Sequence, residues 1–234
     1  MSCKQGSRES YSKTVSVEVV NPLNESRKDV LVYVSLGDTA DVGSVMVRSN
    51  EVQLATQLED SSLWIYLDSM KANEKRTITI YYSTNPMVET ARYRKRTQAV
   101  SLDDKSFGWE SEKIGYLFHN DGVEVLGKKT SDMVLMGIRP DETEFYQTNV
   151  AGSARPYRFG SIGYWNDSVV VKLTHPNNTQ PEIHDGELYS SVVTKFLERP
   201  AHDTIDIVAR YSIQAGSRLT SYSITAPIHI STYD

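Results

Sequence analysis

Apolar and polar residues alternate along much of the chain with the period of two that is typical of a half-buried β-strand. Before residue 85 this alternation predicts strands at residues 14–19 and 76–82. β-Branched and aromatic residues predict a strand at 29–36, and short strands are also predicted at 45–47, 52–54 and 63–67. Turn residues such as Asn21-Pro22 and Gly37-Asp38 separate the predicted strands. Short strands that recur at close spacing between turns are typical of a β-sandwich or barrel.

A second group of predicted strands begins at Phe107. Residues 107–121 and Val123–Gly127 are expected to form a hairpin, with Asn120-Asp121-Gly122 as its tight turn. Residues 133–138 are apolar without interruption, which predicts a strand buried on both faces. Further strands are predicted at residues 144–146, 168–173, 187–197, 204–213, 218–225 and 227–231, with a polar loop at 174–186.

Together these patterns predict an all-β protein, an antiparallel β-sandwich with essentially no helix. We divide it into a flexible tail or lipoprotein tether (1–12), an N-terminal β-sheet segment (13–84), a basic linker (85–99) and a main β-sandwich (100–234). The linker holds Arg92-Tyr93-Arg94-Lys95-Arg96. These charges could be solvated and without a partner, or they could face a carboxylate or sulfate, which an Arg side chain binds through two hydrogen bonds.

Charge and composition exclude several classes of protein. The net charge of −5 over 234 residues argues against general nucleic-acid binding, which requires a basic surface. No apolar run reaches the roughly 18 residues that a transmembrane helix needs. The lone cysteine, Cys3, cannot form an internal disulfide, but it follows a small residue as in the lipidation site of a bacterial lipoprotein. An ordinary start followed by a polar tail is the alternative.

Known catalytic motifs are missing from the sequence. The histidines do not form an HxxxH or HExxH pair, and there is no cysteine pair, so we predict no metal site. There is also no GxSxG elbow, no phosphate-binding loop and no GxGxxG motif, so we predict no cofactor and set aside nucleophilic acyl transfer. Tyrosine, histidine, arginine and carboxylate side chains on a β scaffold remain. Side chains of these kinds can bind sugars and act on them.

Aromatic side chains could stack on sugar rings in this protein. The stacking candidates are Trp109, Tyr116, Tyr157, Tyr164 and Trp165. Each of them could instead be a core or cross-strand aromatic.

Polar candidates lie near these aromatic residues. Arg155 and Arg158 flank Tyr157 in a glycine-containing segment, which suits an anionic sugar. His119 could be a general base or a histidine that faces a turn. Glu110 and Glu112 alternate along one predicted strand, which places both carboxylates on the same sheet face. They could form an acid pair, or they could be exposed charges next to Lys113. Lys113 is itself a binding candidate.

The order of several segments resembles a known family. The segments are 14–23 (TVSVEVVNPL), 27–30 (RKDV), 70–79 (MKANEKRTIT), 91–93 (ARY) and 107–116 (FGWESEKIGY). They resemble Bacteroidetes proteins of unknown function from polysaccharide-utilisation loci. The resemblance implies a galactose-mutarotase-like supersandwich, and at least one member is a dehydratase that removes water from the terminal uronate of ulvan oligosaccharides.

From this resemblance we expect a carbohydrate-active protein that acts on acidic, uronate-containing oligosaccharides by elimination or dehydration, as a carbon–oxygen lyase. A periplasmic or cell-surface lipoprotein anchored at Cys3, or a secreted protein, would fit that setting. Where family members carry an arginine, this chain has Leu117 and Phe118, and residues 141–146 offer acids but no histidine. The alternative is a non-catalytic glycan-binding or structural lipoprotein.

In the catalytic reading, Arg155 or Arg158 would neutralise the uronate carboxylate. His119 or Tyr157 would then remove the α-proton, and a tyrosine or Glu110 would protonate the departing hydroxyl.

Overall fold

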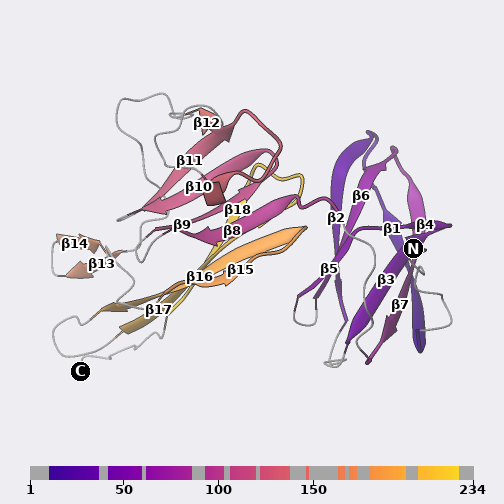
Figure 1. The fold of residues 1–234 in the computed structure, drawn as a ribbon, viewed down its shortest axis with the longest axis horizontal. Coiled ribbons are helices and arrows are strands. Elements are labelled where there is room, and N and C mark those ends of the chain that lie inside the picture. Colours follow the sequence, from indigo (N-terminus) through magenta and orange to yellow (C-terminus); the bar gives the residue numbers. More distant parts are fainter. Residues whose placement is uncertain are drawn as a thin grey trace, which may run out of the picture. The chain divides into compact units, whose positions relative to one another are not determined.

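The computed structural model describes residues 11–36, 42–59, 62–85, 93–102, 106–119, 122–137, 146–147, 163–166, 169–172, 180–198 and 205–226. Within these ranges the chain consists of antiparallel strands and one 3₁₀ turn, η2 (Leu135–Gly137), with no α-helix (Figure 1). The prediction of an all-β antiparallel protein is confirmed. The chain divides into an N-terminal unit, Met1–Lys95, and a C-terminal unit, Arg96–Asp234.

Two antiparallel sheets form the N-terminal unit. One has the order β1-β7-β3-β4, with strands β1 (Lys13–Val20), β7 (Lys75–Ser83), β3 (Ser44–Ser49) and β4 (Val52–Gln53). The other has the order β2-β6-β5, with strands β2 (Arg27–Ser35), β6 (Ser62–Met70) and β5 (Thr56–Glu59). Aliphatic side chains from both sheets form one core, whose buried members are Val45, Val47, Leu63, Ile65, Ile78 and Ile80. Alternation along each strand places these residues on the inner faces.

The C-terminal unit has a five-stranded and a four-stranded sheet. The first has the order β12-β11-β10-β9-β8, with strands β12 (Tyr146–Gln147), β11 (Gly122–Lys128), β10 (Ile114–His119), β9 (Phe107–Ser111) and β8 (Thr97–Ser101). The second has the order β15-β16-β17-β18, with strands β15 (Glu182–His184), β16 (Tyr189–Glu198), β17 (Ile205–Gln214) and β18 (Thr220–Thr225). A separate hairpin joins β13 (Gly163–Asn166) and β14 (Val169–Lys172).

The five-stranded sheet is buried on both faces near β9. One face packs with β16 and β17 (Figure 1). The core on this face is aromatic and includes Phe107, Trp109, Phe118 and Tyr211. The opposite face carries a smaller aliphatic cluster of Val100, Leu117, Leu126 and Leu135. All five residues of β9 are therefore buried.

The prediction of a strand at residues 133–138 is wrong. Residues 135–137 form η2, and Met136 is 76% exposed, although Leu135 is buried. The backbone N–H groups of Val134 and Leu135 bind the Glu110 carboxylate instead of a neighbouring strand. Four strands were not predicted: β5, β8, β13 and β15. Of these, β8 lies partly within the predicted linker, and β15 lies within the predicted loop at 174–186. The strand predicted at 227–231 lies outside the described residues.

Candidate functional site

Trp109 lies at the centre of the aromatic core. Its ring stacks on that of Tyr116, its direct cross-strand partner in β10, with centroids 5.7 Å apart. On the other side it meets Tyr211 of β17 at 4.8 Å. The indole Nε1 donates a hydrogen bond of 2.8 Å to Thr220 Oγ1. With both its faces and its N–H engaged, this ring is a core aromatic.

Tyr116 is enclosed in the same way. Its hydroxyl donates a 2.6 Å hydrogen bond to the backbone oxygen of Arg218, which links β10 to the turn before β18. Burial raises the pKa of Tyr116, outweighing a hydrogen bond from the Thr220 backbone. The two predicted stacking residues whose side chains are described, Trp109 and Tyr116, therefore point into the protein.

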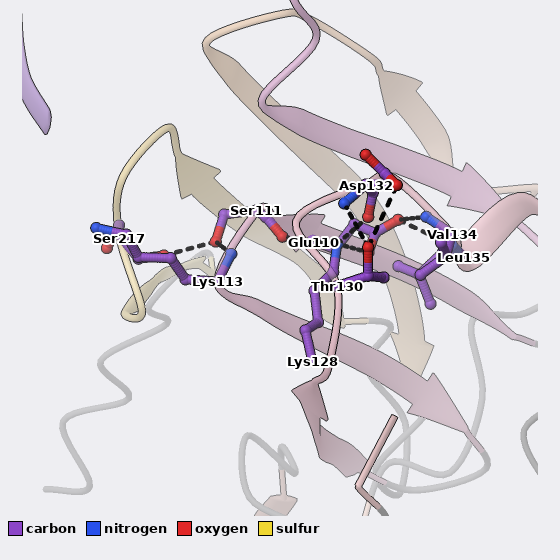
Figure 2. A network of polar contacts seen from close by, with 9 residues as sticks. All are labelled: Glu110, Ser111, Lys113, Lys128, Thr130, Asp132, Val134, Leu135 and Ser217. Atoms are coloured by element: carbon purple, nitrogen blue, oxygen red, sulfur yellow. Dashed lines mark hydrogen bonds and ion pairs between the residues drawn. The ribbon is translucent and has the colours of Figure 1, made fainter. Parts of the chain in front are cut away.

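Glu110 forms a buried ion pair with Lys128 (Figure 2). The Lys128 Nζ lies 2.5 Å from Glu110 Oε2, and the two side chains are 1% and 0% exposed. The other carboxylate oxygen, Oε1, accepts hydrogen bonds from the backbone N–H groups of Val134 and Leu135 at 2.6 and 2.8 Å. Such charge-assisted bonds compensate a buried carboxylate for the loss of water.

Lys128 uses its three ammonium donors within the same network. Besides Glu110, it donates to the backbone oxygens of Ser111 at 3.0 Å and Asp132 at 2.5 Å. The network thereby ties the segment after β11 to the β9–β10 hairpin (Figure 2). Leu135, positioned by this segment, packs closely over Gly108, where an added Cβ would lie 3.1 Å from Leu135 Cδ1. The arrangement is a structural clamp around β9.

Glu112 lies in the turn after β9 and has a different cation. Arg96 Nε and Nη2 donate to Glu112 Oε1 at 3.0 and 2.5 Å, and the Gly216 N–H reaches both carboxylate oxygens. The ion pair joins the start of β8 to the β9–β10 turn, and the Gly216 N–H links this turn to the β17–β18 turn. Glu110 and Glu112 are both largely enclosed, so the view of them as exposed charges is wrong. Each carboxylate has its own cation, unlike two acids that share one site.

Lys113 occupies the β9–β10 turn, where its backbone N–H donates to Ser111 Oγ at 3.1 Å (Figure 2). His119 is at the other end of β10, opposite Gly122 of β11. Glu110 is paired with Gly115 across the hairpin, and His119 lies four residues after Gly115 in β10. The backbones of Glu110 and His119 are therefore offset by about 13 Å along the strand direction. The hairpin thus places these two catalytic candidates well apart.

The remaining candidates have no described side chain. Tyr164 and Trp165 lie in β13, opposite Val171 and Val170 of β14, and only their backbone is described. Arg155, Tyr157 and Arg158 lie outside the described residues. Their roles stay predictions.

Sequence reasoning missed Lys128, the partner of Glu110. The signal was present, since β11 was predicted as the hairpin partner of β10, and Lys128 ends that strand. Among the described residues, no three His, Cys, Asp or Glu side chains form a group that could hold a metal ion. In the same part of the chain, no helix has the length and apolar character to cross a membrane.

Comparison with known proteins gives a family but no relative of known activity. No curated protein matches the chain. A family model described as a domain of unknown function, DUF4861, matches residues 19–229 and so extends over both units. The chain therefore belongs to the DUF4861 family.

Proposed function

We propose that the chain is a secreted or lipid-anchored protein that acts on acidic, uronate-containing oligosaccharides. One observation carries the proposal: the family match runs from residue 19 to residue 229 and includes the Phe107–Tyr116 segment. That segment is also the strongest point of resemblance to the polysaccharide-utilisation proteins, among which an ulvan oligosaccharide dehydratase is found. Its residues form the buried centre of the C-terminal unit.

The chemistry we propose is elimination of water next to a uronate carboxylate. Arg155 or Arg158 pairs with the carboxylate and makes the α-proton more acidic. His119 or Tyr157 takes that proton, the C–O bond to the neighbouring hydroxyl breaks, and a carbon–carbon double bond forms. A tyrosine supplies the proton that lets the hydroxyl leave as water.

We assign Glu110 a positioning role in this scheme instead of proton donation. Its carboxylate is already bound by Lys128 and by two backbone N–H groups, and it is wholly enclosed. The clamp that it forms holds the hairpin whose last residue, His119, is the proposed base.

A non-catalytic glycan-binding protein is the second candidate. Leu117 and Phe118 occupy the positions where the resembled family carries an arginine, and both are buried, one in each core of the five-stranded sheet. An arginine at position 118 would be enclosed in the aromatic core, whereas one at position 117 would lie directly opposite Glu124 of β11. This observation favours a sandwich that binds sugars without transforming them.

The test is the ultraviolet absorbance of unsaturated uronate during incubation with uronic-acid oligosaccharides. Catalysis predicts a rising signal that is lost on replacing Arg155, Arg158 and His119 by alanine, with Arg27→Ala, in the exposed start of β2, as the control. Unchanged turnover in the triple variant would refute the mechanism. A flat trace with binding measured by calorimetry would support the non-catalytic candidate, and neither turnover nor binding would reject both.

A further inference from the structure

An aromatic pair lies on the outer face of the β2-β6-β5 sheet in the N-terminal unit. Tyr33 of β2 and Trp64 of β6 are direct cross-strand partners, and their ring centroids are 5.1 Å apart at an interplanar angle of 57°. Tyr33 is 53% exposed, and Trp64 is partly exposed. An exposed pair of large aromatic rings is unusual on a sheet face and marks a candidate interaction site.

Strand alternation explains why this pair points outward. Val32 and Val34 of β2, and Leu63 and Ile65 of β6, belong to the aliphatic core. Residues between them must face the opposite side of the sheet. The pair is therefore part of the surface of this unit because the strands already bury their other face.

The strand register places polar groups on one side of the aromatic pair, while the row on its other side contains Tyr66 and Leu31. Gln57 of β5 is paired with Trp64, so Gln57, Trp64 and Tyr33 form one row across the sheet. The next row on the same face consists of Glu59, Ser62 and Ser35. The Ser62 hydroxyl donates to the Tyr33 hydroxyl at 3.3 Å, which shows that the two rows are in contact.

The dimensions of these rows suit a sugar ring. Two residues along a strand span about 6.7 Å, which is close to the width of one pyranose ring. A ring stacked on Tyr33 or Trp64 would therefore bring its hydroxyl groups to the level of Ser62, Ser35 and Gln57. An apolar platform with a few convergent polar groups is the usual form of a small-ligand site.

The charged residues of this sheet indicate which ligands the face can bind. Strands β5 and β6 contain no lysine or arginine, and the basic residues of β2 are at its start, with Lys28 five residues from Tyr33, about 17 Å along the strand. The acidic residues of the same sheet are Asp29, Glu59 and Asp68. An anionic ligand would meet no cation from β5, β6 or the part of β2 near Tyr33, and a second copy of the face would oppose acids with acids.

We propose that this face binds neutral sugar units of an oligosaccharide, with Tyr33 and Trp64 as the stacking platform. This face shares no residue with the proposed uronate site, and the inference does not rest on that site being catalytic. The uncharged hydroxyl groups of a neutral sugar can form hydrogen bonds with the carboxylate, amide and hydroxyl side chains of this face. A uronate carboxylate is not matched by these side chains.

The test is calorimetric titration of the full chain with neutral hexasaccharides of glucose, xylose and mannose, and with uronate oligosaccharides of equal length. We expect at least one neutral series to bind, and Tyr33→Ala to weaken that binding by up to about tenfold, the value of one aromatic contact. Trp64→Ala should weaken it at least as much, and Tyr33→Phe should retain most of it. Uronate binding or turnover should be unchanged in these variants.

Tyr81→Ala is the matched control, because Tyr81 packs with Tyr11 on the other sheet of the same unit and not with Tyr33 or Trp64. The proposal is overturned if no neutral series binds, or if Tyr33→Ala and Trp64→Ala bind like the wild-type chain. It is also overturned if Tyr33→Ala converts a dimer in solution to a monomer, because a second copy would then be the occupant. A loss of uronate turnover without any change in neutral-sugar binding would bear on the proposed function and not on this inference.

Discussion

The two units use aromatic residues in opposite ways. The buried core of the N-terminal unit is aliphatic, and its Tyr33–Trp64 pair lies on the outer face of a sheet. In the C-terminal unit, Trp109 and Tyr116 form an equally direct cross-strand pair, but both are buried in a core with phenylalanines and Tyr211. Both pairs are direct cross-strand partners, but the rings lie on an outer sheet face in the N-terminal unit and on a buried one in the C-terminal unit.

This difference shows that residue type does not identify a ligand-stacking ring. What decides is whether another layer of the protein covers the ring. Trp109 is covered by Tyr211 of the four-stranded sheet, and its N–H is bound by Thr220. Tyr33 keeps more than half of its surface exposed. Of the two described aromatic pairs, the exposed one therefore lies in the unit where sequence reasoning did not place a site.

The largest expected effect separates these two pairs. Trp109→Ala should lower the free energy of unfolding by about 3–5 kcal/mol, because it leaves a large cavity between the sheets and removes the partner of Thr220. Tyr33→Ala should lower it by no more than about 1.5 kcal/mol, because a half-exposed ring is removed and its contact with Trp64 is lost. Urea denaturation measures both, and hydrogen exchange assigns the loss to a unit. Equal losses would contradict the distinction between the pairs.

Much of the fold was predictable because one face of most strands is buried. Strands such as β1, β2, β7 and β17 alternate clearly between apolar and polar residues. The strand prediction for residues 133–138 failed because their apolar character reflects contact with a hairpin. The N–H groups of Val134 and Leu135 bind the Glu110 carboxylate of β9. Strand β8 was missed because it follows a basic run, and neighbouring strands stabilise it more than its own sequence pattern does.

The candidate site was less predictable than the fold. The sequence showed that Trp109, Glu110 and Tyr116 belong together, and the hairpin register brings them together. It could not show that they point inward, since burial on both faces of β9 depends on packing with β16, β17 and η2. The pairing of Glu110 with Lys128, 18 residues further along the chain, was missed although the hairpin was predicted, because the predicted strand ended one residue before Lys128.

The second prediction compares a buried ion pair with an exposed one. Lys128→Met should lower the free energy of unfolding by about 3–5 kcal/mol, because it leaves the Glu110 carboxylate charged and enclosed without its cation. Lys75→Met is the matched control in the N-terminal unit. Its partner Glu18 is 3.5 Å away, the two side chains are 67% and 55% exposed, and the expected loss is below about 1 kcal/mol.

Chemical denaturation at low and high salt measures this difference. Salt should reduce the small contribution of Lys75 and leave the effect of Lys128→Met nearly unchanged, because water and ions do not reach the buried pair. Similar losses in the two variants would show that the clamp around β9 is not a significant source of stability.

The third prediction concerns the close packing of the clamp on β9. In Gly108→Ala, the new Cβ would lie 3.0 Å from the backbone oxygen of Tyr116 and 3.1 Å from Leu135 Cδ1. Overpacking of this kind should lower the free energy of unfolding by about 1–3 kcal/mol. Adding Leu135→Ala should give less destabilisation than the sum of the two single variants, because one of the two clashes is removed. Strict additivity in thermal unfolding would contradict this geometry.

The smallest expected effect is an alkaline loss of stability that originates in the aromatic core. Burial, the neighbouring Tyr222 and the hydrogen bond between their hydroxyls raise the pKa of Tyr211 well above its ordinary value of 10.0. Because the folded pKa is above the unfolded one, this stabilising contribution is complete below about pH 10 and is lost as the pH rises beyond it. The loss from Tyr211 should be about 1.4 kcal/mol per pH unit.

Urea denaturation at about pH 9 and about pH 11 measures this slope, and Tyr211→Phe is the control because it keeps the ring and removes the ionising hydroxyl. The variant should be less sensitive to alkali than the wild-type chain. Tyr116 and Tyr222, whose pKa values burial also raises, would account for a remaining slope. If the variant and the wild-type chain lost stability in parallel, the alkaline sensitivity would not arise from Tyr211, and the contrast between an aromatic core and an aromatic surface would lose its pH signature.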